Sequence, residues 1–145
     1  MIRLIGVEKE LGGQPVLQGI DLSIPVGKLT TIIGRSGEGK SVLLKHMIGL
    51  LQPDRGEVWV GDVEISRLSG TPLNDVRKQF AMLFQGAALF DSLSVFENVA
   101  FPLREKLRMK GPAVARRVEE KLEEVGLTGM GHKFPAELSG GMRKR

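Results

Sequence analysis

The spacing of apolar and polar residues predicts strands in the first part of the chain. Residues Ile20–Ile24 alternate between apolar and polar side chains, which is the period of a strand with one buried face. Leu4–Glu8 form an earlier candidate strand, and Gly12–Pro15 supply turn-forming residues between the two. The run Leu29–Ile33 is apolar or β-branched throughout, which predicts a third and more deeply buried strand.

The next segment predicts a hairpin and a further strand. Glu57–Val60 and Val63–Ile65 flank Gly61-Asp62, a dipeptide that favours a two-residue turn between antiparallel strands. Leu73–Gln79 are expected to form a short helix, and Phe80–Phe84 an apolar, buried strand.

Helical spacing dominates elsewhere. Lys40–Leu51 are apolar on most sides, as expected of a helix buried against a sheet. From Leu93 to Arg145 the pattern is mostly helical, and Pro112 suits a first helical turn. After Pro112, one face of the predicted helix is an apolar stripe formed by Val114, Val118, Leu122 and Val125. Arg116, Glu120 and Glu124 face outward, and Arg116 and Glu120 are spaced for an ion pair.

Composition narrows the class of protein. The chain has 145 residues, 41% of them hydrophobic, which is enough for one ordinary globular domain. It has no cysteine, which excludes disulfides and thiolate metal sites and fits a reducing cytosolic setting. The net charge is +4, but no basic run with interleaved aromatic residues is present, so no nucleic-acid partner is expected.

A glycine-rich segment directly after Leu29–Ile33 carries the main functional signal. Glycines there allow successive N–H groups to turn around a phosphate, and a helix N-terminus adds favourable positive potential. The lysine would reach the β- and γ-phosphates of a nucleotide and the last serine would bind Mg²⁺. Although such turns also occur without a ligand, every fixed position of a phosphate-binding P-loop is matched by Gly34, Arg35, Ser36, Gly37, Glu38, Gly39, Lys40 and Ser41.

A second motif, Leu138–Met142, contains Ser139, Gly140 and Gly141. Alone it is a common turn, with Ser139 suited to cap a helix. Taken in order with the P-loop and Phe84-Gln85, it resembles the ATP-binding subunit of ABC transporters, over the whole of Met1–Arg145. The resemblance implies an α/β fold: a P-loop NTPase core with an N-terminal antiparallel β subdomain, to about residue 90, and a helical subdomain over about 91–145.

The resemblance also implies site roles, with ATP and Mg²⁺ as the cofactors. Gln85 corresponds to the Q-loop glutamine, which would sense the γ-phosphate and Mg²⁺ and link the site to the membrane subunit. Ser41 would be the other protein contact of Mg²⁺. Val16 would be an apolar wall for the base, while Leu11 stands where the family usually has an adenine-stacking aromatic residue. Three residues would complete the ATP site of a second protomer in a head-to-tail dimer: Ser139, Gly140 and Gly141.

Finer features resemble a subgroup of these ATPases. Met82–Leu93, Ser94–Leu103 and a signature motif ending in Met142 look like ATPases that drive phospholipid traffic with MCE-domain proteins. A membrane permease and an MCE-type lipid-binding protein would then be partners, with the ATPase cytoplasmic on the inner face of the plasma (inner) membrane. The alternative is the ATPase of a different ABC importer.

The family's hydrolytic residues follow the signature helix, and this chain ends four residues beyond Gly141. We therefore expect an ABC ATPase truncated after the signature motif that does not turn over ATP alone. A catalytically inactive nucleotide-binding fragment is the alternative. ABC proteins of translation or DNA repair are less favoured because no second ATPase half or heptad run is present, and a P-loop kinase would not need Leu138–Gly141.

Three isolated residues are expected to be structural. Trp59 lies in the predicted hairpin and is expected to pack there. His46 falls in the helix after the P-loop and His132 in a loop, and both are expected to be buried or solvated without a catalytic role.

Overall fold

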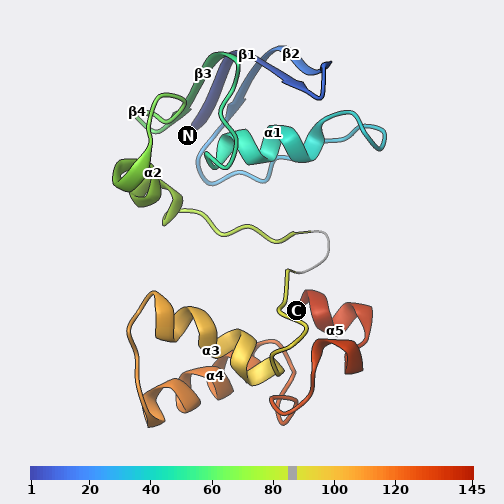
Figure 1. The fold of residues 1–145 in the computed structure, drawn as a ribbon, viewed down its shortest axis with the longest axis vertical. Helices are drawn as coiled ribbons and strands as arrows, with labels where there is room; N and C mark the ends of the chain where they lie inside the picture. The colour runs from blue at the N-terminus through green and yellow to red at the C-terminus, as the bar shows by residue number, and fades with distance from the viewer. Residues whose placement is uncertain (85–87) are drawn as a thin grey trace. The chain divides into compact units, whose positions relative to one another are not determined.

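The computed structural model describes residues 1–84 and 88–145, and the chain folds as two compact units (Figure 1). The first unit covers Met1–Ala81 and the second Met82–Arg145. Of the sequence-predicted sites, Gln85 lies outside the described residues.

The first unit is built on an antiparallel sheet of strand order β2-β1-β3-β4. Its strands are β1 (Ile2–Leu11), β2 (Gln14–Ile24), β3 (Arg55–Val60) and β4 (Val63–Glu64). The two N-terminal strands extend beyond the predicted ranges, and Gly12-Gly13 form the turn between them. The predicted hairpin is confirmed: Val60 pairs with Val63 across Gly61-Asp62, and Gly61 has the positive φ of 61° that this tight turn requires.

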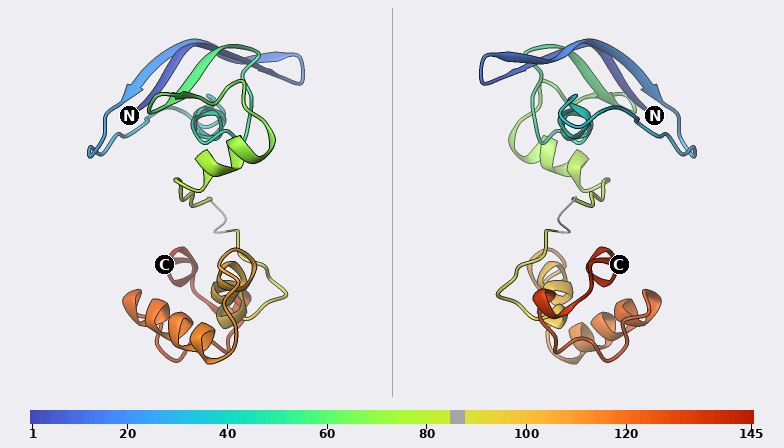
Figure 2. Two further views of the ribbon diagram at one scale, coloured as in Figure 1. Left: turned by 90° about the vertical axis from the view of Figure 1, so that its left-hand side faces the viewer. Right: turned by 90° about the vertical axis from the view of Figure 1, so that its right-hand side faces the viewer.

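Two helices, α1 (Lys40–Met47) and α2 (Gly70–Arg77), contribute to the core of this unit. Helix α1 lies beneath the curved sheet in both side views (Figure 2). The buried core combines strand and helix residues: Leu4, Val7, Leu17, Leu43, Met47, Val58, Ile65, Leu73 and Val76.

Both helices differ from the predicted bounds. Helix α1 ends at Met47 and not Leu51, because Gly49 adopts a left-handed φ of 69° and the amides of Leu50 and Leu51 both donate to the Lys45 carbonyl. Helix α2 begins at Gly70, three residues before the predicted start at Leu73.

The predicted strands at Leu29–Ile33 and Phe80–Phe84 are wrong for the structure as described. Within residues 1–84 and 88–145, neither segment joins the ladder of β1 to β4. Leu29 is 96% exposed, Ile33 89% and Leu83 69%, although Ile32 and Phe80 of the same runs pack against the core of this unit. A strand needs a hydrogen-bonding neighbour as well as a suitable composition, and composition alone led to these two predictions.

The second unit is helical, with α3 (Val95–Glu105), α4 (Pro112–Glu124), the 3₁₀ turn η1 (Pro135–Glu137) and α5 (Gly140–Lys144). Pro112 occupies the first turn of α4, as predicted. Val114, Val118 and Leu122 are buried in the core of this unit, with Val125 packed against it. The opposite face carries the predicted Arg116–Glu120 ion pair, with Nε and Oε1 3.8 Å apart.

The isolated residues behave as structural residues where their contacts are described. The indole of Trp59 donates to Glu57 at 2.8 Å and lies beside the Arg3 guanidinium. His46 is 1% exposed, with Nδ1 2.8 Å from the Val42 carbonyl oxygen one helical turn earlier. Across the described ranges, no helix is long and apolar enough to cross a membrane.

Candidate functional site

The P-loop adopts the left-handed backbone that its glycines were expected to provide at two of three positions. Gly37 has φ 88° and Gly39 φ 82°, a region in which a side chain is strained. Gly39 is also the N-cap of α1, and its carbonyl accepts the Leu43 amide at 2.8 Å. The loop therefore ends where the amides of a helix N-terminus begin, which is the arrangement that favours an anion.

Gly34 differs from the other two glycines of the loop. Its φ lies outside the left-handed region, but a Cβ at this position would lie 2.7 Å from Oε2 of Glu38. Because this oxygen is the end of a flexible side chain, a Cβ on Gly34 would displace the Glu38 carboxylate, and its nearest contacts would all be side-chain atoms.

Lys40 and Ser41 are the first two residues of α1. The Lys40 ammonium donates to the Gly34 carbonyl at 2.8 Å and also to the Arg35 carbonyl. The ammonium is thus held over the loop by two of its carbonyl oxygens. Ser41 is exposed at the start of the helix. The fold thereby brings the sequence-predicted Lys40 and Ser41 together with the glycines.

The loop packs against β2 at Gly39. A Cβ there would lie 2.9 Å from Cγ1 of Val16 and 3.1 Å from its carbonyl oxygen. A small cavity of about 140 Å³ adjoins this contact, and it is lined by Val16, Leu17, Ile20, Ile32, Ile33, Glu38, Gly39, Lys40 and Leu43. The structure therefore places Val16 beside the P-loop.

The donor set fits Mg²⁺ held jointly with a nucleotide. Among the described residues, no three His, Asp or Glu side chains are grouped so that they could hold a metal by themselves. Mg²⁺ commonly binds through one or two protein oxygens and the phosphates of its nucleotide. The exposed Ser41 hydroxyl beside Lys40 is suited to that role.

The predicted signature residues lie in the helical unit. Ser139 is the N-cap of α5, and its Oγ accepts the Met142 amide at 3.2 Å, as predicted for a capping serine. Gly140 and Gly141 are exposed in the first turn, and a Cβ on either would meet nothing within 4 Å. This turn consequently presents open backbone to solvent.

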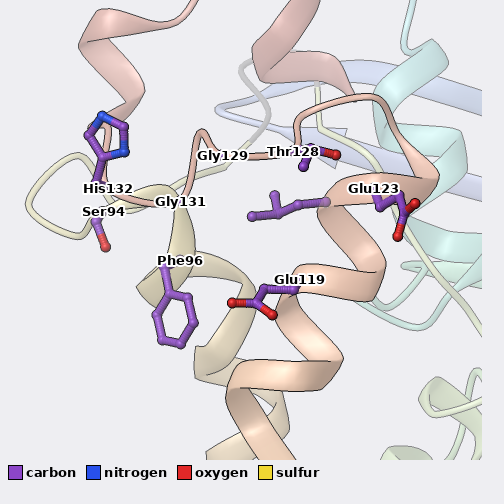
Figure 3. Close-up of a pocket in the computed structure, with 9 residues that line it drawn as sticks. Ser94, Phe96, Glu119, Glu123, Thr128, Gly129, Gly131 and His132 are labelled. Atoms are coloured by element: carbon purple, nitrogen blue, oxygen red, sulfur yellow. The ribbon is translucent and has the colours of Figure 1, made fainter.

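A larger cavity, of about 600 Å³, lies elsewhere in the helical unit (Figure 3). Glu119 and Glu123 project from α4 on one side, while Phe96 extends from α3. The remaining lining residues are Ser94, Leu122, Thr128, Gly129, Gly131 and His132. None of the residues predicted to bind ATP is among them.

Comparison with known proteins agrees with the motif order. The family model described as ABC transporter matches residues 17–145. The chain is 44% identical over 144 residues to the probable ribonucleotide transport ATP-binding protein mkl of Mycobacterium leprae, covering 99% of this chain and 42% of that protein. It is also 44% identical over 134 residues to the intermembrane phospholipid transport system ATP-binding protein MlaF of Escherichia coli K12, and this match covers 92% of this chain and 50% of that protein. The chain thus spans half or less of the length of these curated relatives.

Solved structures give the same assignment. A dimeric, post-hydrolysis structure of the ATP-binding cassette MJ0796 bound to ADP and Pi matches with a TM-score of 0.85 and 31% identity, covering 99% of this chain and 65% of that one. A second dimeric structure of MJ0796, described as a bacterial ABC transporter cassette, also matches with a TM-score of 0.85. On the family match, the sequence identities and the fold, the chain belongs to the ABC transporter family.

Proposed function

We propose that this chain binds ATP with Mg²⁺ as part of an ATPase subunit that powers phospholipid transport. The observation that carries the proposal is the P-loop itself: left-handed glycines at 37 and 39 lead into a helix that begins with Lys40 and Ser41. Family membership supports this proposal because ABC ATPases bind ATP with Mg²⁺.

Each residue of the loop would have a distinct task. The amides of Gly34–Gly39 and of the first turn of α1 would bind the phosphate oxygens, and Lys40 would turn its ammonium from the loop carbonyls to the β- and γ-phosphates. Ser41 would bind Mg²⁺, which neutralises phosphate charge, and Gln85 is proposed as its second protein contact. Val16 and the exposed Leu11 at the end of β1 would offer aliphatic contact to the base in place of aromatic stacking.

The signature residues would act on a second protomer. We propose that Ser139, Gly140 and Gly141 contact the ATP of a partner subunit, so that two sites form in a head-to-tail dimer. Their exposure and the capped N-terminus of α5 support this role, as does the dimeric assembly of the MJ0796 cassette.

The transported substrate is proposed to be a phospholipid. The resemblance of Met82–Leu93 to ATPases of phospholipid traffic supports this, together with the identity to MlaF. A membrane permease, an MCE-type lipid-binding protein and a position on the cytoplasmic side of the inner membrane belong to the same proposal. Ribonucleotide transport is the second candidate, because the mkl protein of Mycobacterium leprae has the same 44% identity over slightly more of the chain.

Titration with Mg-ATP tests the nucleotide site. Lys40→Ala should lower ATP affinity by more than tenfold, because Lys40 supplies the positive charge nearest the phosphates. Lys28→Ala, an exposed lysine of the same unit, is the matched control and should leave affinity unchanged. Equal affinity for wild type and Lys40→Ala would reject the proposed site.

The expectation that this chain alone does not turn over ATP stays a prediction. Phosphate release from ATP, measured in the same samples, tests it.

A second measurement separates the transported substrates. The complete ATPase subunit that contains this chain would be reconstituted with its permease in vesicles, and ATP hydrolysis would be recorded with added phospholipid carrier or added ribonucleotide. Stimulation by the lipid-loaded carrier supports phospholipid transport. Stimulation by ribonucleotide alone would replace that proposal with the second candidate.

A further inference from the structure

Glu38 places a carboxylate inside the P-loop. Its Oε2 accepts the Arg35 amide hydrogen at 2.6 Å, a short and charge-assisted hydrogen bond. The same oxygen lies only 2.7 Å from the position that a Cβ on Gly34 would occupy. The side chain is therefore folded back over the first half of the loop, although the residue stays exposed to solvent.

A carboxylate in this position competes for the groups that would hold a phosphate. Both are anions that accept from backbone N–H groups, and both are favoured by the positive end of a helix such as α1. Because Glu38 lies one residue before the N-cap of this helix, its charge would also repel a triphosphate in the same loop. Among the described residues Lys40 forms no ion pair with Glu38, and its ammonium donates instead to the Gly34 and Arg35 carbonyls.

We propose that Glu38 is an internal competitor of the phosphate chain and sets the affinity of the P-loop for nucleotide. ATP binds only when the Glu38 carboxylate leaves the Arg35 amide. The apparent affinity is consequently reduced by the fraction of molecules in which the carboxylate is folded in. This inference rests on the proposed ATP site and adds a residue that determines its affinity.

The proposed competition predicts the order in which Glu38 variants differ in their affinity for Mg-ATP. Glu38→Gln keeps an acceptor for the Arg35 amide but removes the charge, whereas Glu38→Ser removes both the charge and the reach. The dissociation constant for Mg-ATP should fall in the order wild type, Glu38→Gln, Glu38→Ser, with roughly a tenfold difference between the first and the last. The gain should appear with ATP and with pyrophosphate, and it should be absent with adenosine, which has no phosphate.

The experiment is a calorimetric titration of the full chain and its variants with Mg-ATP, pyrophosphate and adenosine. Glu10→Gln is the matched control, because Glu10 is exposed in the same unit and its side chain makes no contact with the P-loop among the described residues. It removes the same charge and should leave the dissociation constant unchanged. Circular dichroism establishes that every variant is folded.

The titrations test separately whether the loop binds ATP and whether Glu38 competes with the phosphates. If wild type binds ATP and Lys40→Ala does not, but both Glu38 variants bind as wild type or more weakly, Glu38 only clips the loop and the inference is overturned. An equal gain in Glu10→Gln would assign the effect to general charge and would also overturn it. If no variant binds ATP or pyrophosphate, the proposed function fails and the inference fails with it.

Discussion

Gly39 lies against Val16 with no space for a side chain between them. A Cβ on Gly39 would be 2.9 Å from Cγ1 of Val16 and 3.1 Å from its carbonyl oxygen, and Leu17 approaches to 3.3 Å. Distances this short from a Cβ require the backbone of β2 to shift, because one of the opposing atoms belongs to the main chain. The last glycine of the P-loop is thereby fixed to the sheet, and α1 begins from a defined point.

Gly39→Ala should therefore damage both stability and the nucleotide site. The left-handed φ of 82° costs an alanine roughly 1 kcal/mol or more, and the collision with β2 adds to that cost. We expect a loss of about 2–4 kcal/mol in the free energy of unfolding, measured by urea denaturation. Mg-ATP affinity should fall by at least tenfold, because the amides of the first turn of α1 move with the loop.

Gly37→Ala is the control that separates the cost of a left-handed backbone from the cost of the contact between a Cβ and Val16. Gly37 also has a left-handed φ, of 88°, but a Cβ there would meet nothing within 4 Å. Its loss of stability should stay near the backbone cost of about 1–2 kcal/mol. Equal destabilisation by the two variants would show that the contact with Val16 contributes nothing.

The backbone of the segment before α3 is held by hydrogen bonds to the side-chain amide of Asn98. The Asn98 Oδ1 accepts the Phe90 amide at 2.8 Å, and its Nδ2 donates to the carbonyls of Phe90, Leu93 and Ser94 at 3.0–3.1 Å. Asn98→Ala should lower the unfolding free energy by about 1–3 kcal/mol, because several backbone groups lose their partner at once. Asn98→Asp keeps an acceptor for the Phe90 amide but sets a carboxylate against three carbonyl oxygens, so urea denaturation at pH 7 should show it to be no more stable than alanine. An alanine variant as stable as wild type would contradict this account.

Local sequence signals predicted the elements that depend on local interactions. The Gly61-Asp62 turn, the Val114–Val118–Leu122 stripe and the Ser139 cap each involve residues within a few positions of one another. The strands expected at Leu29–Ile33 and Phe80–Phe84 failed because strand formation requires a distant partner. An apolar run does not reveal whether a neighbouring strand is available.

The candidate site shows the same division. The P-loop motif predicted the positions of Lys40 and Ser41 at the start of a helix, because its glycines determine the local backbone. Glu38 was predicted as one of the P-loop residues, but its contact with the Arg35 amide was not, since a variable position of a motif carries no signal of its own. Its contact with the Arg35 amide and its closeness to Gly34 emerge only from the folded loop.

Ser139 should have a role that a comparable capping residue lacks. Ser139→Ala removes the acceptor of the Met142 amide and should cost about 1 kcal/mol locally. If Ser139 also contacts the ATP of a partner, ATP-dependent dimer formation in analytical ultracentrifugation should weaken as well. Ser94→Ala removes the capping box of α3 in the same unit and should leave dimer formation unchanged. The same loss of dimer in both variants would mean that Ser139 acts only as a cap.

The ion pair between Lys9 and Asp54 should make stability depend on acid pH. Lys9 Nζ lies 2.6 Å from Asp54 Oδ1, and the Glu10 amide donates to Oδ2 at 2.7 Å. These two hydrogen bonds hold the pKa of Asp54 below its ordinary value of 3.8, and the one from Lys9 has the larger effect. A carboxyl whose pKa is lower in the folded state stabilises the fold fully above the ordinary value, and the contribution disappears as the pH falls through the lowered pKa.

Asp54→Asn should therefore have a lower free energy of unfolding than wild type at pH 7. The difference should shrink as the pH falls below 3.8, which urea denaturation at a series of pH values would measure. Lys9→Met removes the first cause of the shift while leaving the carboxyl in place, so the Asp54 pKa followed by NMR should rise toward its ordinary value. Should Asp54→Asn and wild type differ by the same amount at pH 7 and pH 2.5, the ionised carboxylate would not be the source of the stability, and the amide contact with Glu10 alone would explain it.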